Sequence, residues 1–427
     1  MLLRRTLLLL VTAAASAHAQ ATTVLRAARM VDARRGTVVP NAVVVVQGER
    51  ITAAGSGVAV PAGATVIDLG DATLLPGLID SHTHLLQNYD PKIGGDDPNM
   101  VLTVATMSAA KRALLGARMG REDLEAGITT VRDLGNSGWS GDVALRDAIA
   151  AGWVTGPRIL ASTRALSAAG GQFGPLQADV QKLIDQEYVV ISGVDDARRA
   201  VRQAFFDGAD LIKVIVNTGP RIVSLEEMRT IVEEARRARR TVAAHAIGDV
   251  ATRIAAEAGV SSIEHAYTIP DDALRMMASK RIFLVPTDYP DEFYLPPGLT
   301  PQQRTEHLAG IARFTQASRD RLRRALAFGV PIAFGSDEYY AVPSQSRGQS
   351  SLQPFLAYAA SGMTPMQIIQ SATVNGAELA GLGDRIGALE AGKVADVIAV
   401  DGDPTRDIAA LVRGASFVMK GGAVVKR

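Results

Sequence analysis

Two histidines, His82 and His84, close a short apolar run at residues 74–85 that reads as a β-strand. Alternate side chains of a strand point to the same face, so the two imidazoles project together. Neutral imidazole is a common ligand of divalent metals, and this pair could supply half of a metal site. The alternative is two hydrogen-bonded histidines in a loop, and a His-x-His pattern alone does not exclude it.

Residues of similar chemistry occur at the ends of other apolar segments. His245 and His265 end two short apolar runs, and Asp337 directly follows a third. The chain has no cysteine, so a metal would have to be held by nitrogen and oxygen atoms. A further histidine, His307, lies in a polar helical stretch and is predicted to be a surface residue.

Lys213 interrupts the apolar segment at residues 211–216, where a lone ammonium would be costly to bury. One interpretation is an ion pair with Asp210 or Asp133. The other is that the amine has reacted with carbon dioxide to give a carbamate, whose two oxygens could bridge two cations. The sequence leaves both interpretations open.

The composition suits a soluble protein with one large barrel-type domain and a smaller one, since 427 residues are too many for one ordinary core. Apolar residues make up 47% of the chain and charged residues 21%. Lys and Arg number 45 against 44 Asp and Glu, and no basic stripe stands out. No nucleic-acid partner is therefore expected.

The first nineteen residues have the pattern of a secretory signal peptide. Arg4 and Arg5 precede an apolar run too short to span a bilayer, and residues 17–19 form a small-x-small cleavage signal ending at Ala19. A membrane anchor is the alternative. We predict an exported protein, periplasmic or secreted, with no membrane association once residues 1–19 are removed.

The rest of the chain predicts an α/β fold in which a (β/α)₈ barrel, residues 76–384, is flanked by β-rich segments. The flanks, residues 20–75 and 385–427, are expected to form one small β-sandwich domain from both termini. A helix is predicted from Ser224, a good N-cap, to Arg239. After an opening strand that ends at His84, barrel strands are predicted at 129–133, 158–162, 211–216, 241–245, 262–265, 282–286 and 332–336.

Active sites of such barrels lie at the carboxyl ends of the strands, so the four histidines and Asp337 are expected on one rim. At this point the chain resembles the amidohydrolase superfamily of metal-dependent hydrolases over essentially its whole length after the signal peptide. The resemblance rests on residues 76–84, 127–135, 209–213, 244–245, 259–265, 334–337 and 387–397.

The resemblance implies a centre of two divalent metal ions, usually zinc. His82, His84 and Asp337 would hold one ion, His245 and His265 the other, and carboxylated Lys213 would bridge them. Asp337 and His265 are the catalytic candidates, and Asp337 would take a proton from the attacking water and deliver it to the leaving nitrogen.

Within the superfamily the chain resembles the prolidase-like branch of metal-dependent carboxypeptidases, which includes ochratoxin-hydrolysing amidohydrolases. Residues 167–174, with Gln172, look closer to those members. The resemblance implies hydrolysis of the amide bond of a C-terminal amino acid in dipeptides or in N-acyl and N-aroyl amino acids, by a homo-oligomer. The alternatives are an imidazolonepropionase-like cyclic amide hydrolase or a lactone hydrolase on the same scaffold, and a binding protein that has lost catalysis.

A carboxypeptidase needs a cation for the substrate carboxylate, ideally an arginine. Arg221 is the first candidate, with Arg164 and Arg347 as reserves, although each could be a solvated loop residue. Tyr289 and Tyr339 are predicted to line an apolar side-chain pocket. Alternatively, a basic side chain could be selected by nearby acids: Asp288, Asp291 and Glu292.

Overall fold

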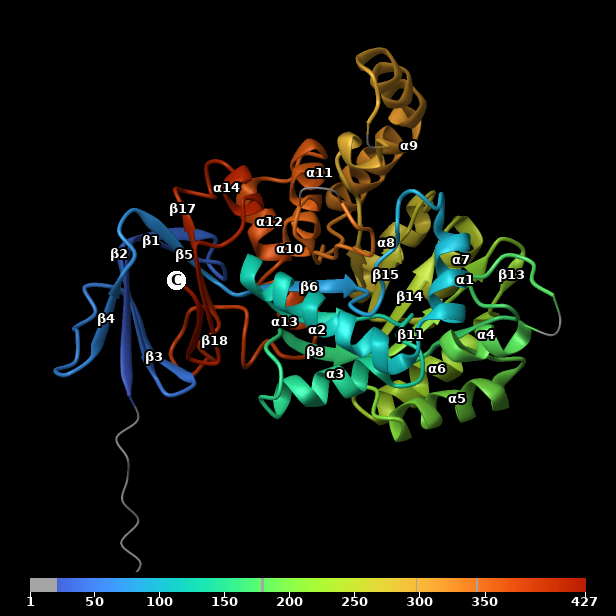
Figure 1. Ribbon diagram of the computed structural model, residues 1–427, viewed down its shortest axis with the longest axis horizontal. Helices are drawn as coiled ribbons and strands as arrows, with labels where there is room; N and C mark the ends of the chain where they lie inside the picture. Colours follow the sequence, from blue (N-terminus) through green and yellow to red (C-terminus); the bar gives the residue numbers. More distant parts are fainter. Residues whose placement is uncertain (1–20, 178–179, 297, 343–344) are drawn as a thin grey trace, which may run out of the picture.

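The computed structural model describes residues 21–177, 180–296, 298–342 and 345–427. The predicted signal peptide lies outside these residues. Figure 1 shows a sheet made from both ends of the chain beside a larger body of strands and helices. The two parts are joined directly, because β5 (Ala72–Pro76) of the sheet is followed by β6 (Leu78–Thr83) of the larger body.

The terminal sheet has eight strands. Both flanks of the sequence contribute to it, as predicted. Its order is β19-β18-β17-β5-β1-β2-β3, with β4 paired to β1. Antiparallel pairing of β17 with β5, for example Ile398 opposite Leu75, joins the two termini. The pairing shows one continuous sheet, and its division into two packed layers stays a prediction. The other strands are β1 (Thr22–Asp32), β2 (Thr37–Gln47), β3 (Arg50–Ser56), β4 (Thr65–Asp68), β17 (Val397–Asp401), β18 (Phe417–Lys420) and β19 (Ala423–Lys426).

The larger body is built on parallel strands that form two arcs, β6-β7-β8 and β10-β9-β11-β14-β15-β16. Their bounds are β7 (Ile128–Asp133), β8 (Arg158–Ala161), β9 (Ala165–Ser167), β10 (Tyr188–Val190), β11 (Ile212–Ile215), β14 (Val242–Ala246), β15 (Ser262–His265) and β16 (Phe283–Val285). A short hairpin, β12 (Asn217–Thr218) and β13 (Arg221–Ile222), follows β11. Seven of the eight predicted barrel strands correspond to these elements.

One end of each arc meets the other directly, and the remaining ends are joined through residues 332–337. The amide of Asp210 donates to the carbonyl of Ala161 at 2.7 Å, and the amide of Ser81 donates to the carbonyl of Phe334 at 2.8 Å. The third barrel strand is broken into β8 and β9 by Thr163, whose φ is +60°. These joins close the parallel strands into the expected barrel.

The eighth strand, predicted at 332–336, is not a regular strand. Only Ile332 forms a parallel bridge, with Leu284. The chain then passes very close to its neighbours at Gly335, and Asp337 adopts a left-handed conformation with a φ of +52°. Such a path is incompatible with continuous strand pairing.

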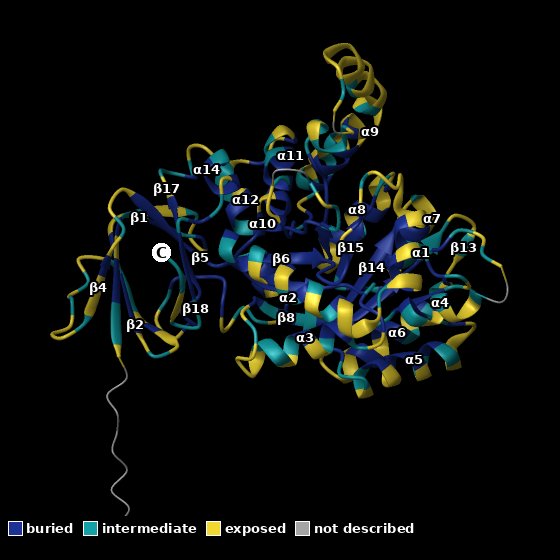
Figure 2. Cartoon of the chain, in the orientation of Figure 1, coloured by how far each residue is buried: buried dark blue, intermediate teal, exposed yellow. Residues whose placement is uncertain are grey.

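Helices cover the outside of the barrel, and Figure 2 shows their buried faces turned toward the strands. The predicted helix after Ser224 is α6 (Leu225–Arg237), which begins with a capping box between Ser224 and Glu227. The others are α1 (Asp96–Thr106), α2 (Ala109–Ala126), α3 (Gly141–Ala150), α4 (Gln181–Glu187), α5 (Val194–Phe206), α7 (Asp249–Ala258), α8 (Asp271–Lys280), α9 (Pro301–Ala327), α10 (Arg347–Ser351), α11 (Pro354–Ala360), α12 (Pro365–Ser371), α13 (Val374–Leu379), α14 (Ala409–Val412) and the 3₁₀ turn Asp291–Tyr294.

Within the described ranges no single helix has the length and apolar character needed to cross a bilayer. The pair α1 and α2 passes the same test only when counted together across a 120° bend.

We predict that Gly335→Ala destabilises the barrel. A Cβ at this position would lie 2.4 Å from Val285 Cγ1 and 2.8 Å from His82 Cβ, and overpacking of this kind costs about 1–3 kcal/mol of folding free energy. Urea unfolding measures the change. The matched control is Gly310→Ala in α9, where the added methyl meets open space and should stabilise the helix by up to about 1 kcal/mol. Equal stability of the two variants would contradict this account of the closure.

Candidate metal centre

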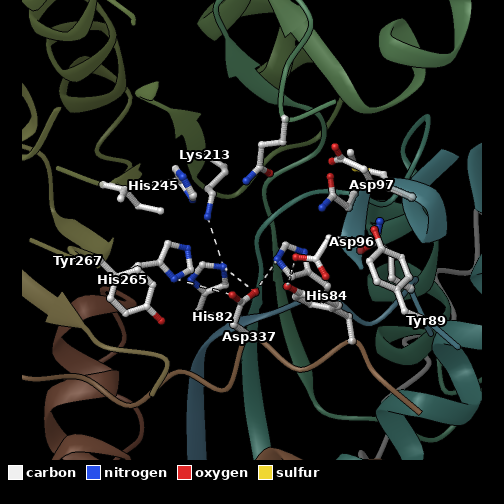
Figure 3. A pocket seen from close by; sticks show the side chains of 16 residues that line it. His82, His84, Tyr89, Asp96, Asp97, Lys213, His245, His265, Tyr267 and Asp337 are labelled. Carbon is white, nitrogen blue, oxygen red and sulfur yellow. Dashed lines mark hydrogen bonds and ion pairs between the residues drawn. The ribbon is translucent and has the colours of Figure 1, made fainter. Parts of the chain in front are cut away.

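The structure brings the predicted metal ligands together in one pocket of about 300 Å³ at the carboxyl ends of the barrel strands. Figure 3 shows Lys213, His82 and Asp337 pointing toward one another, with His84, His245 and His265 around them. His82 lies in β6, Lys213 in β11, and His245 and His265 at the ends of β14 and β15. His307 is exposed on α9, as predicted.

Asp337 is the centre of this group. One carboxylate oxygen lies 3.4 Å from His82 Nε2 and 3.1 Å from His84 Nε2, and the other lies 3.8 Å from His265 Nδ1. His82, His265 and Asp337 offer ligand atoms that are all within 4.8 Å of one another. A single cation placed among them could therefore contact all three.

Hydrogen-bond partners at Nδ1 orient the rings of His82 and His84. His82 Nδ1 lies 2.9 Å from Glu264 Oε2, and His84 Nδ1 lies 2.9 Å from the carbonyl oxygen of Gly135. Such contacts fix which ring nitrogen carries the proton and leave Nε2 with a lone pair. In both residues Nε2 is the atom that faces Asp337, so the donor set fits a divalent metal.

Burial favours the neutral form of His82, His245 and His265. Removal from water is the main reason that the pKa values of His82 and His265 lie well below their usual value, and it lowers the pKa of His245 to about 3. Burial acts to raise the pKa of Asp337, but the neighbouring His82, His84 and Lys213 outweigh it and leave this pKa below its usual value. The site therefore combines neutral nitrogen donors with an ionised carboxylate.

Lys213 is buried in β11, with its Nζ 3.3 Å from His82 Nε2. Burial lowers the pKa of its amine to about 8. In the described part of the chain it forms no ion pair: Asp210 pairs with Arg146, and Asp133 accepts hydrogen bonds from other groups. The interpretation of Lys213 as the partner of one of these acids is therefore wrong.

Sequence reasoning missed Glu264. This fully buried carboxylate contacts His82 on one side and pairs with the equally buried Arg132 at 3.0 Å on the other. Arg132 also donates to the carbonyl of Ser81 at 2.6 Å, which ties the pair to β6. A charged residue within the apolar run that ends at His265 was the available signal.

The structure does not bring Arg221 to the pocket. Its two terminal nitrogens each donate, at 2.8 Å, to a carbonyl of the loop after β9, those of Ala169 and Phe173. This arrangement does not support the predicted contact with a substrate carboxylate, because the guanidinium is already used to hold a loop.

The two reserve arginines are also engaged elsewhere. The Arg164 guanidinium lies 3.7 Å from the centroid of the Trp139 ring, and buried Arg347 pairs with Asp123 at 3.2 Å. Among the described residues that line the pocket there is no arginine. A carboxylate bound here must therefore be recognised by other groups.

An aromatic hollow adjoins the metal pocket across Asp337 and Tyr339. It has a volume of about 430 Å³ and includes both Tyr289 and Tyr339, as the sequence predicts for an apolar pocket. Tyr289 stacks on Phe293 at 3.7 Å between centroids and donates its hydroxyl hydrogen to Glu338. Thr287, Asp337 and Glu338 are its polar members, and most of the other lining side chains are aromatic or aliphatic, among them Tyr267, Tyr294, Leu295, Phe314 and Tyr340.

The acids proposed to select a basic side chain have partners of their own. Asp288 pairs with Arg321 and Asp291 with Arg319. Glu292 lies 3.9 Å from the guanidinium of Arg304. This leaves the hollow largely apolar, which favours the apolar alternative.

Comparison with known proteins gives a consistent result. A family profile described as "Amidohydrolase family" matches residues 73–425. An ochratoxinase of Aspergillus niger is 30% identical over 385 residues, covering 83% of this chain and 75% of that protein. An imidazolonepropionase of Fusobacterium nucleatum subsp. nucleatum is 25% identical over 389 residues, covering 84% and 85%.

Solved structures agree with this fold. A Xaa-Pro dipeptidase with bound methionine in the active site matches with a TM-score of 0.81 and 30% identity, over 95% of this chain and 100% of that one. The A. niger ochratoxinase structure matches with a TM-score of 0.80 and 27% identity, over 95% and 96%.

We predict that Glu264→Gln weakens metal binding by about 10- to 100-fold, because loss of the carboxylate behind a ligating histidine changes its orientation and basicity. Competition with a chelator of known affinity measures this on folded protein. Glu257→Gln, on the exposed surface of α7, is the control for loss of one negative charge. An unchanged affinity in Glu264→Gln would show that Glu264 does not support the site.

Proposed function

The chain belongs to the amidohydrolase family, and from that premise we propose that it is a metal-dependent hydrolase cleaving the amide bond of a C-terminal amino acid in dipeptides or in N-acyl and N-aroyl amino acids. The observation that carries the proposal is the gathering of four buried histidines, Lys213 and Asp337 around one point beside an aromatic hollow.

We propose that two divalent metal ions are the cofactors, from the family resemblance, and that they are zinc, from the nitrogen-rich set of ligands. His82, His84 and Asp337 would hold one ion, and His245 and His265 the other. Bound there, the ions would lower the pKa of a water molecule toward neutrality and polarise the scissile carbonyl. The supporting observation is that His82 and His84 each contact the protein through Nδ1 and turn Nε2 toward Asp337.

Carboxylation of Lys213 would resolve an otherwise unfavourable arrangement. An ammonium there is buried beside neutral histidines, and it offers no lone pair to a metal. In the proposed reaction the uncharged amine forms an N–C bond to carbon dioxide, and one amine proton leaves to solvent. The resulting carbamate carries two oxygens and a negative charge that suits two neighbouring cations.

Asp337 is proposed to move the proton. Its carboxylate is ionised and faces the pocket, so it can accept a proton from the attacking water and donate it to the leaving nitrogen. His265, the second catalytic candidate, lies 3.8 Å from the same carboxylate and is fixed by a 2.7 Å contact with the Thr287 hydroxyl. It would hold Asp337 in position while that proton moves.

The aromatic hollow supports a substrate with a large apolar group. A space of about 430 Å³ lined by aromatic rings can hold an aroyl group or an apolar side chain. The similarity to an ochratoxinase and to a Xaa-Pro dipeptidase supports the same class of amide, with ochratoxin A as one candidate. Hydrolysis of a cyclic amide is a second candidate, favoured only by the similarity to imidazolonepropionase.

We also propose that the protein is exported to the periplasm or the medium, on the pattern of residues 1–19. Homo-oligomerisation is proposed from the family resemblance alone. For the terminal sheet we propose a β-sandwich, supported by a separate apolar cluster that includes Leu25, Val44, Leu74, Val397 and Phe417.

The first test is a liquid-chromatography screen of the purified, metal-loaded protein. We expect cleavage of dipeptides or N-aroyl amino acids, ochratoxin A among them, with loss of activity on chelation and recovery on adding zinc. Turnover of lactones or cyclic imides alone would favour another hydrolase on this scaffold. A preparation that is inactive throughout and holds no tightly bound divalent ion would instead indicate a binding protein.

The second test separates the roles of Lys213 and Asp337. Lys213→Ala should lose most of its bound metal, because the bridge between the two ligand groups is removed. Asp337→Asn should keep more metal but turn over about 10²- to 10⁴-fold more slowly, the usual cost of losing a positioned acid–base group. Metal analysis and steady-state rates measure both. A near wild-type rate in Asp337→Asn would disprove the proton-transfer role.

A further inference from the structure

One wall of the metal pocket is lined by carboxamide side chains. Gln87, Asn136 and Gln172 all contribute to it, although they come from three different loops of the chain. Since the lining contains no arginine among the described residues, these amides and the tyrosine hydroxyls are the neutral hydrogen-bonding groups available to a polar part of the substrate.

Tyr188 orients two of the three amides. Its hydroxyl lies 3.1 Å from Asn136 Oδ1 and 3.1 Å from Gln172 Oε1. Tyr188 is 1% exposed, and burial raises the pKa of its phenol well above the usual value, so it keeps its hydrogen as a donor. The single hydroxyl hydrogen can be donated to only one of these two oxygens at a time, and the amide that accepts it has its NH₂ group left to face other partners.

The Tyr188 ring is itself held in place. Phe173 packs against it edge to face, at 5.9 Å between ring centroids. Gly171 lies so close that a Cβ there would be 2.2 Å from Tyr188 Cδ2. A fixed ring fixes the position of its hydroxyl, and the two amides that contact it are held in turn.

Gln87 supplies an independent observation. It is 1% exposed, and its Nε2 has no hydrogen-bond acceptor among the described residues. Buried amide donors are nearly always paired, so this donor beside the pocket calls for an acceptor that the described residues do not supply, such as a water or a ligand oxygen. A carbonyl or carboxylate oxygen has the required chemistry.

We propose that Gln87, Asn136 and Gln172 bind the free carboxylate of the substrate, with Tyr188 as the residue that positions the last two. The inference rests on the proposed function, since a C-terminal amino acid carries such a carboxylate beside the scissile amide. Amide N–H groups donate to its oxygens, and hydrogen bonds to an ionised acceptor are stronger than neutral ones. They take the place of the expected arginine.

The acids of the same pocket are compatible with this assignment. The carboxylate of Asp96 accepts hydrogen bonds from the hydroxyls of Tyr339 and Tyr340, which disperse its charge. Asp97 lies beside the loop that carries Gln172, since a Cβ on Gly174 would be 2.8 Å from Asp97 Oδ2, so the hydrogen bonds from the amides have to outweigh its repulsion of a substrate carboxylate.

The test compares two substrates that differ only in the carboxylate: N-benzoyl-phenylalanine and N-benzoyl-phenylalaninamide. Gln172→Glu keeps the size of the side chain and an oxygen for the Tyr188 hydroxyl, but it adds a negative charge. We expect it to raise the ratio of KM for the acid to KM for the amide at least tenfold. Tyr188→Phe, which leaves both amides free to turn, should raise the same ratio about threefold or more. The control is Gln47→Glu, at the exposed end of β2, and it should leave this KM ratio unchanged.

Three results would overturn the inference. The first is that Gln172→Glu changes KM for the acid and KM for the amide by the same factor. The second is that the ratio of these two KM values is unchanged in both Gln172→Glu and Tyr188→Phe. The third is that the wild-type protein has a lower KM for the amide than for the acid. If the wild-type protein cleaves the amide bond of no C-terminal amino acid, the proposed function fails and the inference fails with it. If the wild type is active and the variants are not selective, only the inference fails.

Discussion

The site depends on how the barrel closes. The amide of Asp337 donates to the carbonyl of His82 at 2.6 Å, and the amide of Ser81 donates to the carbonyl of Phe334 at 2.8 Å. These two backbone contacts join the first barrel strand to the last segment of the barrel and place the Asp337 carboxylate against the histidines. Gly335 makes the approach possible, because a larger residue would collide with Val285 and His82. The close approach at Gly335 and the centre of the site are therefore adjacent in the chain.

The local backbone conformation and the burial of polar groups at this site are both unfavourable, so the surrounding structure must stabilise it. His265, Thr287 and Asp337 all have positive φ angles, between +52° and +64°, a conformation that costs about 1–2 kcal/mol for a residue with a side chain. Neutral histidines and an unpaired lysine are also buried in the pocket, which only strong packing of the surrounding strands can maintain. Backbone strain beside buried polar groups is typical of a functional site.

Sequence periodicity predicted much of this arrangement, and the amidohydrolase resemblance is confirmed by the family match. Residues that end buried parallel strands, such as His245 and His265, can be placed because strand ends share one edge of a barrel. Loop side chains cannot be placed in this way. The direction of Arg221 is set by two carbonyls of a separate loop, and no local pattern encodes that contact. The same limit applies to the irregular last strand, whose path is fixed by contacts across the barrel at Gly335.

In the proposed function, the metal pocket and the aromatic hollow, which both include Asp337, would recognise different parts of the substrate. Burial of an aromatic group is favourable but not directional, so the aromatic hollow can supply affinity without fixing the position of the scissile bond. Hydrogen bonds from amides are directional, so the proposed contacts with Gln87, Asn136 and Gln172 would fix the position of the substrate. A substrate held in both hollows would have its scissile amide near Asp337, which lines both of them. Since the metal ligands lie on strands and the recognition groups lie on loops, the chemistry can stay constant while loop changes alter the substrate.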